Sequence, residues 1–118
     1  MVMIPEQRAA QRTLIGLFRG GSGVRLSKED GLCIWRGVES EEWGLGAVQL
    51  TEHLDALGIP YSVAIMASPF RKGMKPGFDV RITWDQLHLV TKWVPSFRRV
   101  IDAVAAQSWV AAPDTSSE

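Results

Sequence analysis

Two patterns of apolar residues alternate along this chain of 118 residues, and their order constrains the fold more than any other feature. In three stretches apolar residues recur every three or four positions, which is the period of a helix lying on a core. Between these stretches lie short segments in which apolar and polar residues alternate, the period of a half-buried strand. The order predicts a helix, two strands, a helix, two strands and a helix.

The first two helical stretches have recognisable starts and ends. Pro5 is a favourable first-turn residue, and Gly20 follows the last apolar positions, so the first helix is expected between them. The second stretch has an N-cap candidate at Ser40 and is expected to become regular near Leu45. Gly58 then provides the left-handed residue that commonly ends a helix.

The last helical stretch is interrupted by Pro95, which cannot donate the backbone hydrogen bond of a regular helix. We therefore expect two helices, at about 84–93 and 96–107, packed on the same core. The domain is expected to span residues 1–110, and residues 111–118 have the polar composition of a disordered tail.

The strand-like segments form two expected hairpins. Residues 24–27 and 32–36 flank an Asp-Gly turn, which is a strong hairpin signal. Residues 61–67 and 78–83 flank a basic turn. Together they predict an α+β fold of order αββαββα, with a four-stranded antiparallel sheet and helices on one face. The other face of the sheet is then left for solvent or for a ligand.

Composition narrows the class of protein. The formal net charge is zero and 46% of the residues are apolar, which is typical of globular proteins and unlike a dedicated non-specific nucleic-acid binder. The single cysteine, Cys33, excludes a disulfide framework and a multi-cysteine zinc site. No apolar run is long enough for a bilayer, and the first residues lack signal-peptide features. We expect a cytoplasmic protein with no membrane association.

Residues 14–22 read Leu-Ile-Gly-Leu-Phe-Arg-Gly-Gly-Ser. This segment, at the end of the first helix of an αββαββα order, resembles a degenerate signature of the LAGLIDADG homing endonucleases. The similarity extends over roughly residues 8–107, including the Leu-Gly end of the second helix. The resemblance implies a homodimer in which Gly16, Leu17 and Gly20 lie at a helix–helix interface. It also implies that the helix-free sheet face binds the major groove of double-stranded DNA.

The chain departs from this family at the residues that carry its chemistry. The family's metal-binding acid occupies the eighth signature position, which is Gly21 here, and the sixth position is Arg19. Hydrolysis assisted by Mg²⁺ needs carboxylate ligands, and neither residue supplies one. We therefore expect a DNA-binding protein with no catalytic residues, no metal and no cofactor.

The DNA-binding interpretation names a set of basic residues in the two hairpins and at their tip. Arg25 and Arg81 are expected on the helix-free face because their strand neighbours are apolar. The full predicted set is Arg25, Arg36, Arg71, Lys72, Lys75 and Arg81. Ordinary solvated surface charge is the competing interpretation of the same residues.

Two other functions stay open at this stage. The chain is alternatively a small non-enzymatic inhibitor or adaptor that binds a protein through the acidic block at 28–57 or through exposed tryptophans. A metal-dependent DNA endonuclease is the third alternative, and its acid would have to come from elsewhere, such as Asp79 or Asp30.

Overall fold

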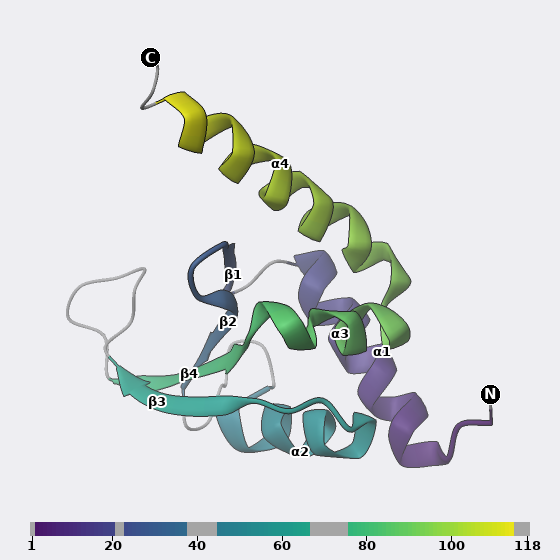
Figure 1. Ribbon diagram of the computed structural model, residues 1–118. Coiled ribbons are helices and arrows are strands. Elements are labelled where there is room, and N and C mark those ends of the chain that lie inside the picture. The colour runs from purple at the N-terminus through teal and green to yellow at the C-terminus, as the bar shows by residue number, and fades with distance from the viewer. Residues whose placement is uncertain (1, 21–22, 38–44, 67–75, 115–118) are drawn as a thin grey trace.

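A four-stranded antiparallel sheet with strand order β1-β2-β4-β3 lies at the centre of the computed structural model (Figure 1). The structure describes residues 2–20, 23–37, 45–66 and 76–114, with side chains up to residue 106. The strands are β1 (Val24–Ser27), β2 (Gly31–Arg36), β3 (Ser62–Met66) and β4 (Gly77–Ile82). The predicted α+β class and its antiparallel sheet are confirmed.

The helices follow the predicted order around this sheet. They are α1 (Pro5–Gly20), α2 (Ala47–Leu57), α3 (Leu87–Trp93) and α4 (Arg98–Asp114), with short 3-10 turns η1 (Trp84–Gln86) and η2 (Pro95–Phe97). The break between α3 and α4 falls at the proline, as expected from its missing donor.

Helix α2 begins two residues later than predicted. Gly46 caps it, and the Gly46 N–H donates to the Gln49 side-chain oxygen at 3.0 Å. Gly58 ends it in the left-handed conformation at φ 71°. The predicted cap at Ser40 lies outside the described residues.

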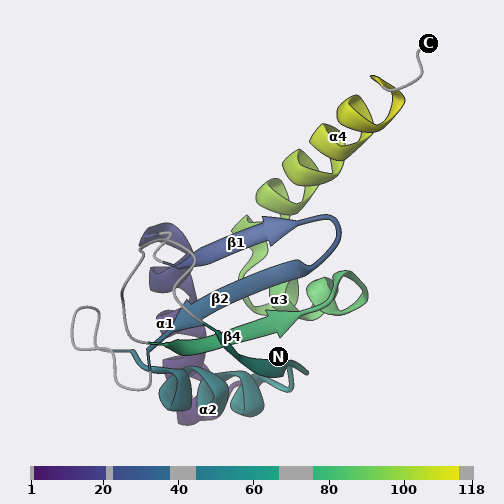
Figure 2. The same ribbon diagram turned by 90° about the vertical axis from the view of Figure 1, so that its left-hand side faces the viewer.

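The core lies between the sheet and its helices. In β2 and β4, Leu32 pairs with Ile82 and Ile34 pairs with Val80, and all four side chains are fully buried. They pack with apolar residues of α1, α2 and α3, among them Leu14, Leu50, Leu54 and Val90. Each such side chain contributes about 1.5–3 kcal/mol when it leaves water. In Figure 2 the sheet lies in front of α1 and α3, and none of the described helices covers the face that is turned toward the viewer.

The helix-free face is less open than alternation alone predicts, because every residue of β2 is buried. Trp35 is 7% exposed, and its ring lies so close to Gly77 that a side chain at 77 would collide with it. The Trp35 indole N–H also donates to the Met66 carbonyl at 3.4 Å, across the width of β4. The tryptophan therefore shields part of the face that was expected to be solvated.

Helix α4 extends well beyond the rest of the fold in both views (Figures 1 and 2). It continues to Asp114, so the first four residues of the predicted tail are helical, and residues 115–118 lie outside the described part. Within the described ranges, no helix combines the length and apolar composition that crossing a bilayer requires.

The turn between β1 and β2 gives a first prediction. Gly31 has φ +80°, and a Cβ there would collide with the Ile82 carbonyl oxygen. We expect Gly31→Ala to lower the free energy of unfolding by at least about 2 kcal/mol. The control is Gly16→Ala, where no atom lies within 4 Å of the added carbon and a gain of about 0.5–1 kcal/mol is expected. Urea unfolding measures both, and equal stabilities would contradict this turn geometry.

Candidate functional site

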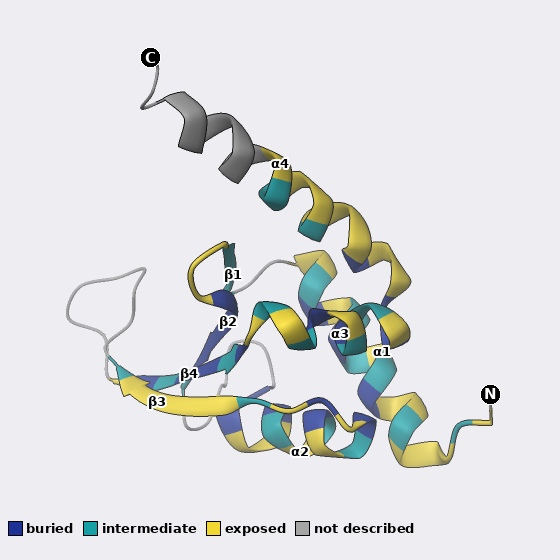
Figure 3. Ribbon diagram, in the orientation of Figure 1, coloured by how far each residue is buried: buried dark blue, intermediate teal, exposed yellow. Residues whose placement is uncertain are grey.

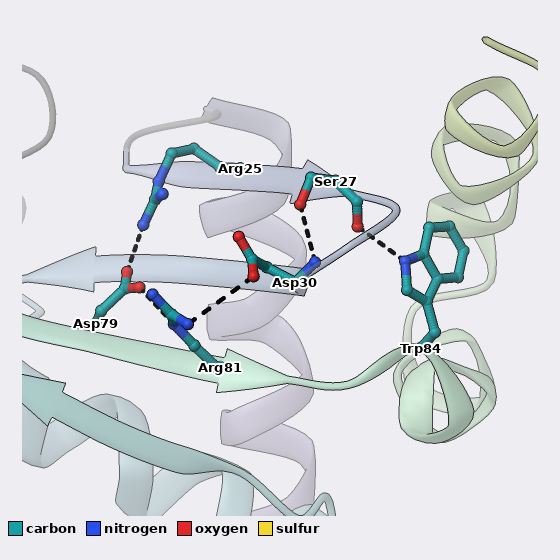
Figure 4. A network of polar contacts seen from close by, with 6 residues as sticks. All are labelled: Arg25, Ser27, Asp30, Asp79, Arg81 and Trp84. Carbon is teal, nitrogen blue, oxygen red and sulfur yellow. Dashed lines mark hydrogen bonds and ion pairs between the residues drawn. The ribbon is translucent and has the colours of Figure 1, made fainter. Parts of the chain in front are cut away.

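The helix-free face of the sheet, made by Arg25, Ser27, Cys33, Trp35, Asp79 and Arg81, is the first candidate site. Strand register brings Arg25 beside Cys33 and Cys33 beside Arg81. Both arginines therefore lie on the face on which the sequence placed them. Arg25 is in β1 and Arg81 is in β4, with β2 between them in the sheet (Figure 4).

A buried carboxylate holds these two arginines. Asp79 is fully buried, and Arg25 Nη2 forms an ion pair and hydrogen bond with its Oδ1. Arg81 Nε donates to the other oxygen, Oδ2, at 2.8 Å. A buried charge is costly unless it is paired in this way. The hydrogen bond to Asp79 is also the main cause that raises the pKa of Arg81.

The arginines are therefore only partly available to a ligand. Their side chains are 34% and 39% exposed, and both guanidinium groups are directed at the carboxylate. Arg81 Nη1 also lies 4.0 Å from Asp30 Oδ1, at the exposed end of the cluster. The two positive charges are balanced by two negative charges, so this cluster is not a basic surface.

Arg36 does not lie on this face, which corrects its predicted place among the DNA contacts. It shares the helix-covered side of β2 with Leu32 and Ile34, and it is 1% exposed. Burial lowers the pKa of Arg36. The run of apolar residues in β2 gave no alternation from which its direction could be read. Arg71, Lys72 and Lys75 lie outside the described residues.

The predicted dimer helix presents its glycines but not its leucine. A Cβ on Gly16 or Gly20 would meet no atom within 4 Å, so neither glycine makes a close contact with another described element of this chain. Leu17 is 9% exposed and belongs to the chain's own core. It is therefore not available to a second helix in this conformation.

Asp79 and Cys33 are held in unreactive settings, whereas Asp30, the other acid considered for catalysis, is 54% exposed. Asp79 is closed in by the two arginines, and the described residues contain no group of three His, Cys, Asp or Glu side chains placed to hold a metal ion. Cys33 is a free, buried thiol, and burial, followed by the charge of Asp79, raises its pKa. A raised pKa keeps the thiol protonated and poorly nucleophilic near neutral pH.

The described tryptophans also serve the fold. Trp35 and Trp93 are buried, and the Trp93 indole N–H donates to the Leu57 carbonyl at 3.0 Å. Trp84 is half-buried and donates to the Ser27 carbonyl at 2.8 Å, which ties the first hairpin to η1 (Figure 4). The prediction of an exposed tryptophan patch is therefore not met by these three side chains.

Sequence reasoning missed a second candidate site, the β3 edge (Ser62–Met66). It is an outer strand of the sheet, and its first four residues are exposed (Figure 3). Val63 is 46% exposed and Ile65 is 75% exposed, although both point to the helix-covered side of the sheet. Val48, on the neighbouring α2, is 53% exposed. The available signal was a strand without charge or proline, but strand order was needed to show that it is an edge.

Comparison with family models, curated proteins and solved structures finds no match to this chain. The resemblance to the LAGLIDADG family therefore stays a prediction from the sequence.

The buried carboxylate gives a second prediction. Asp79→Asn removes the charge that holds two arginines, and we expect it to lower the free energy of unfolding by about 2 kcal/mol, since the partly exposed arginines regain some water. Asp30→Asn is the matched control, because Asp30 is 54% exposed. We expect the control to cost less than about 0.5 kcal/mol. Urea unfolding of both variants measures these changes. A similar loss of unfolding free energy in the two variants would contradict the role given to Asp79.

Proposed function

We propose that this chain is a non-enzymatic protein-binding domain that pairs the β3 edge with an extended strand of its partner. The observation that carries the proposal is the apolar, exposed outer strand, in which Val63 and Ile65 are 46% and 75% exposed. The unreactive settings of Asp79 and Cys33 agree with a domain that binds without catalysis. A reducing, cytoplasmic setting fits the free thiol.

The two edges of the sheet differ in how they are protected. Proteins usually guard an edge strand with charge, proline or a covering element, because its unpaired N–H and C=O groups otherwise pair with other chains. The β1 edge carries Arg25, and α4 passes beside it (Figure 2). The β3 edge, Ser62–Met66, has no charged residue and no proline. This difference supports β3 as the edge kept for pairing.

Strand addition also sets the character of the partner segment. Backbone hydrogen bonds provide affinity, and alternate side chains provide specificity. Val63 and Ile65 lie on the same side of β3 as α2. The partner segment is therefore expected to be extended, with apolar side chains at every second position on that side.

This proposal is tested with peptides selected from a displayed random library at low domain concentration. We expect the selection to yield extended peptides with alternating apolar residues. The Ile65→Lys variant is expected to bind these peptides at least about tenfold more weakly than the wild type, because its charge faces their apolar side. Val100→Lys is the matched control: Val100 is also exposed, at 44%, but lies on α4. Fluorescence anisotropy measures the affinities. A selection without such peptides, or equal binding to both variants, would contradict the proposal.

Double-stranded DNA is the second candidate, favoured by the presence of Arg25 and Arg81 on one helix-free face. Because both guanidinium groups are held by Asp79, two phosphate contacts at most are expected from this cluster. Such binding would fall about tenfold in affinity between about 50 mM and about 200 mM salt.

A gel shift with random and palindromic duplexes tests this candidate. A shift that is lost in the double variant Arg25→Gln/Arg81→Gln, and kept in Arg98→Gln, would favour DNA over protein as the ligand. Arg98 is a suitable control because its side chain is 67% exposed and lies on α4. No shift at low salt would remove the DNA candidate.

A further inference from the structure

We propose that the partner strand at the β3 edge is β3 of a second copy of this chain, so that two sheets join into one antiparallel sheet of eight strands. This inference rests on the proposed function and names its partner. It places the dimer at the sheet edge, and not at α1, where the sequence placed it.

The strand is complementary to itself. If two copies of Ser62–Met66 run antiparallel with Ala64 opposite Ala64, then Val63 of each copy lies opposite Ile65 of the other. Residues directly opposite in antiparallel strands have Cβ atoms about 4.5–5.5 Å apart. The two exposed apolar residues of each copy therefore cover those of its partner. The remaining pair, Ser62 with Met66, contains no charged residue.

Electrostatics permit this approach in a way that they do not at the other edge. Among the described residues no strand pairs with the outer side of β3, so its N–H and C=O groups there can pair with the complementary groups of an antiparallel copy. The strand contains no ionised side chain, and the chain has a formal net charge of zero, so two copies meet without like charges opposed at the strand and without net repulsion. At the β1 edge, by contrast, the strand itself contains the charged residue Arg25, and α4 lies beside it.

The helix next to the strand also exposes an apolar side chain. Helix α2 runs beside β3 in both views (Figures 1 and 2), and it exposes Val48. Val48 therefore adds exposed apolar surface on the helix next to β3.

Sedimentation equilibrium tests the inference, with concentrations up to about 1 mM, where even a contact worth only ~4 kcal/mol is half populated. We expect the average mass of the wild type to rise with concentration from that of one chain toward twice that mass. Ile65→Lys is expected to weaken the dimer at least about tenfold, since it replaces an apolar cross-strand pair by a charge facing valine. Ile65 is 75% exposed, so this change leaves the fold of one copy intact, which circular dichroism checks.

Two further variants test the register and the location. The double variant V63E/I65K places opposite charges across both pairs and is expected to recover the dimer that I65K loses. Gly16→Leu is the control for an α1 interface, and it is expected to leave the dimer unchanged, because the space beside Gly16 is open.

The outcomes separate this inference from the proposed function. A monomeric wild type, an unchanged dimer in I65K, or a dimer dissociated by G16L would each overturn the β3 dimer. A monomer that still binds the selected peptides would overturn the second copy as partner and leave strand addition standing. A dimer that is lost in I65K, recovered in V63E/I65K and competed by those peptides would support both.

Discussion

The antiparallel pairing of β2 with β4 is the interaction on which the rest of this structure depends. On one side it aligns Leu32 with Ile82 and Ile34 with Val80, and these four buried side chains form the floor on which the helices pack. On the other side it brings Trp35 beside Asp79 and Cys33 beside Arg81. A slip of one residue would move every side chain of a strand to the opposite face, so the core and the polar cluster fix the same register.

That register determines what the helix-free face is able to bind. Asp79 is fully buried there, and a buried carboxylate must have partners. Arg25 and Arg81 supply them from the strands on either side of β2. The positive charges of Arg25 and Arg81, on which the DNA-binding prediction rested, thus stabilise the sheet itself. Exposed apolar side chains of the sheet lie at the β3 edge, where the described helices do not cover Val63 and Ile65.

The elements themselves were largely predictable from the sequence. Strict alternation in 78–83 indicated β4, and Pro95 marked the break between the last two helices, because both effects are local. Arg36 was not predictable, since Leu-Cys-Ile-Trp before it shows no alternation. The pairing of Asp79 with Arg25 was also hidden, because Arg25 lies 54 residues away in the chain.

The order of the strands in the sheet was the feature most needed to locate the candidate binding site, and the sequence did not predict it. Two hairpins are compatible with several sheets, and in this sheet the pairing of β2 with β4 places β3 at an edge. The glycines of α1 suggested a helix interface by their spacing alone, yet in the fold they face open space and Leu17 faces the core. Sequence spacing therefore identified a surface without showing what it contacts.

Hydrogen–deuterium exchange at several protein concentrations tests the central claim most directly, because it reports the backbone groups of β3 themselves. The account predicts that amides of Ser62–Met66 exchange more slowly as the concentration rises, while amides of the β1 edge and of α1 do not change. Exchange in β3 that is independent of concentration, or added protection confined to α1, would contradict it.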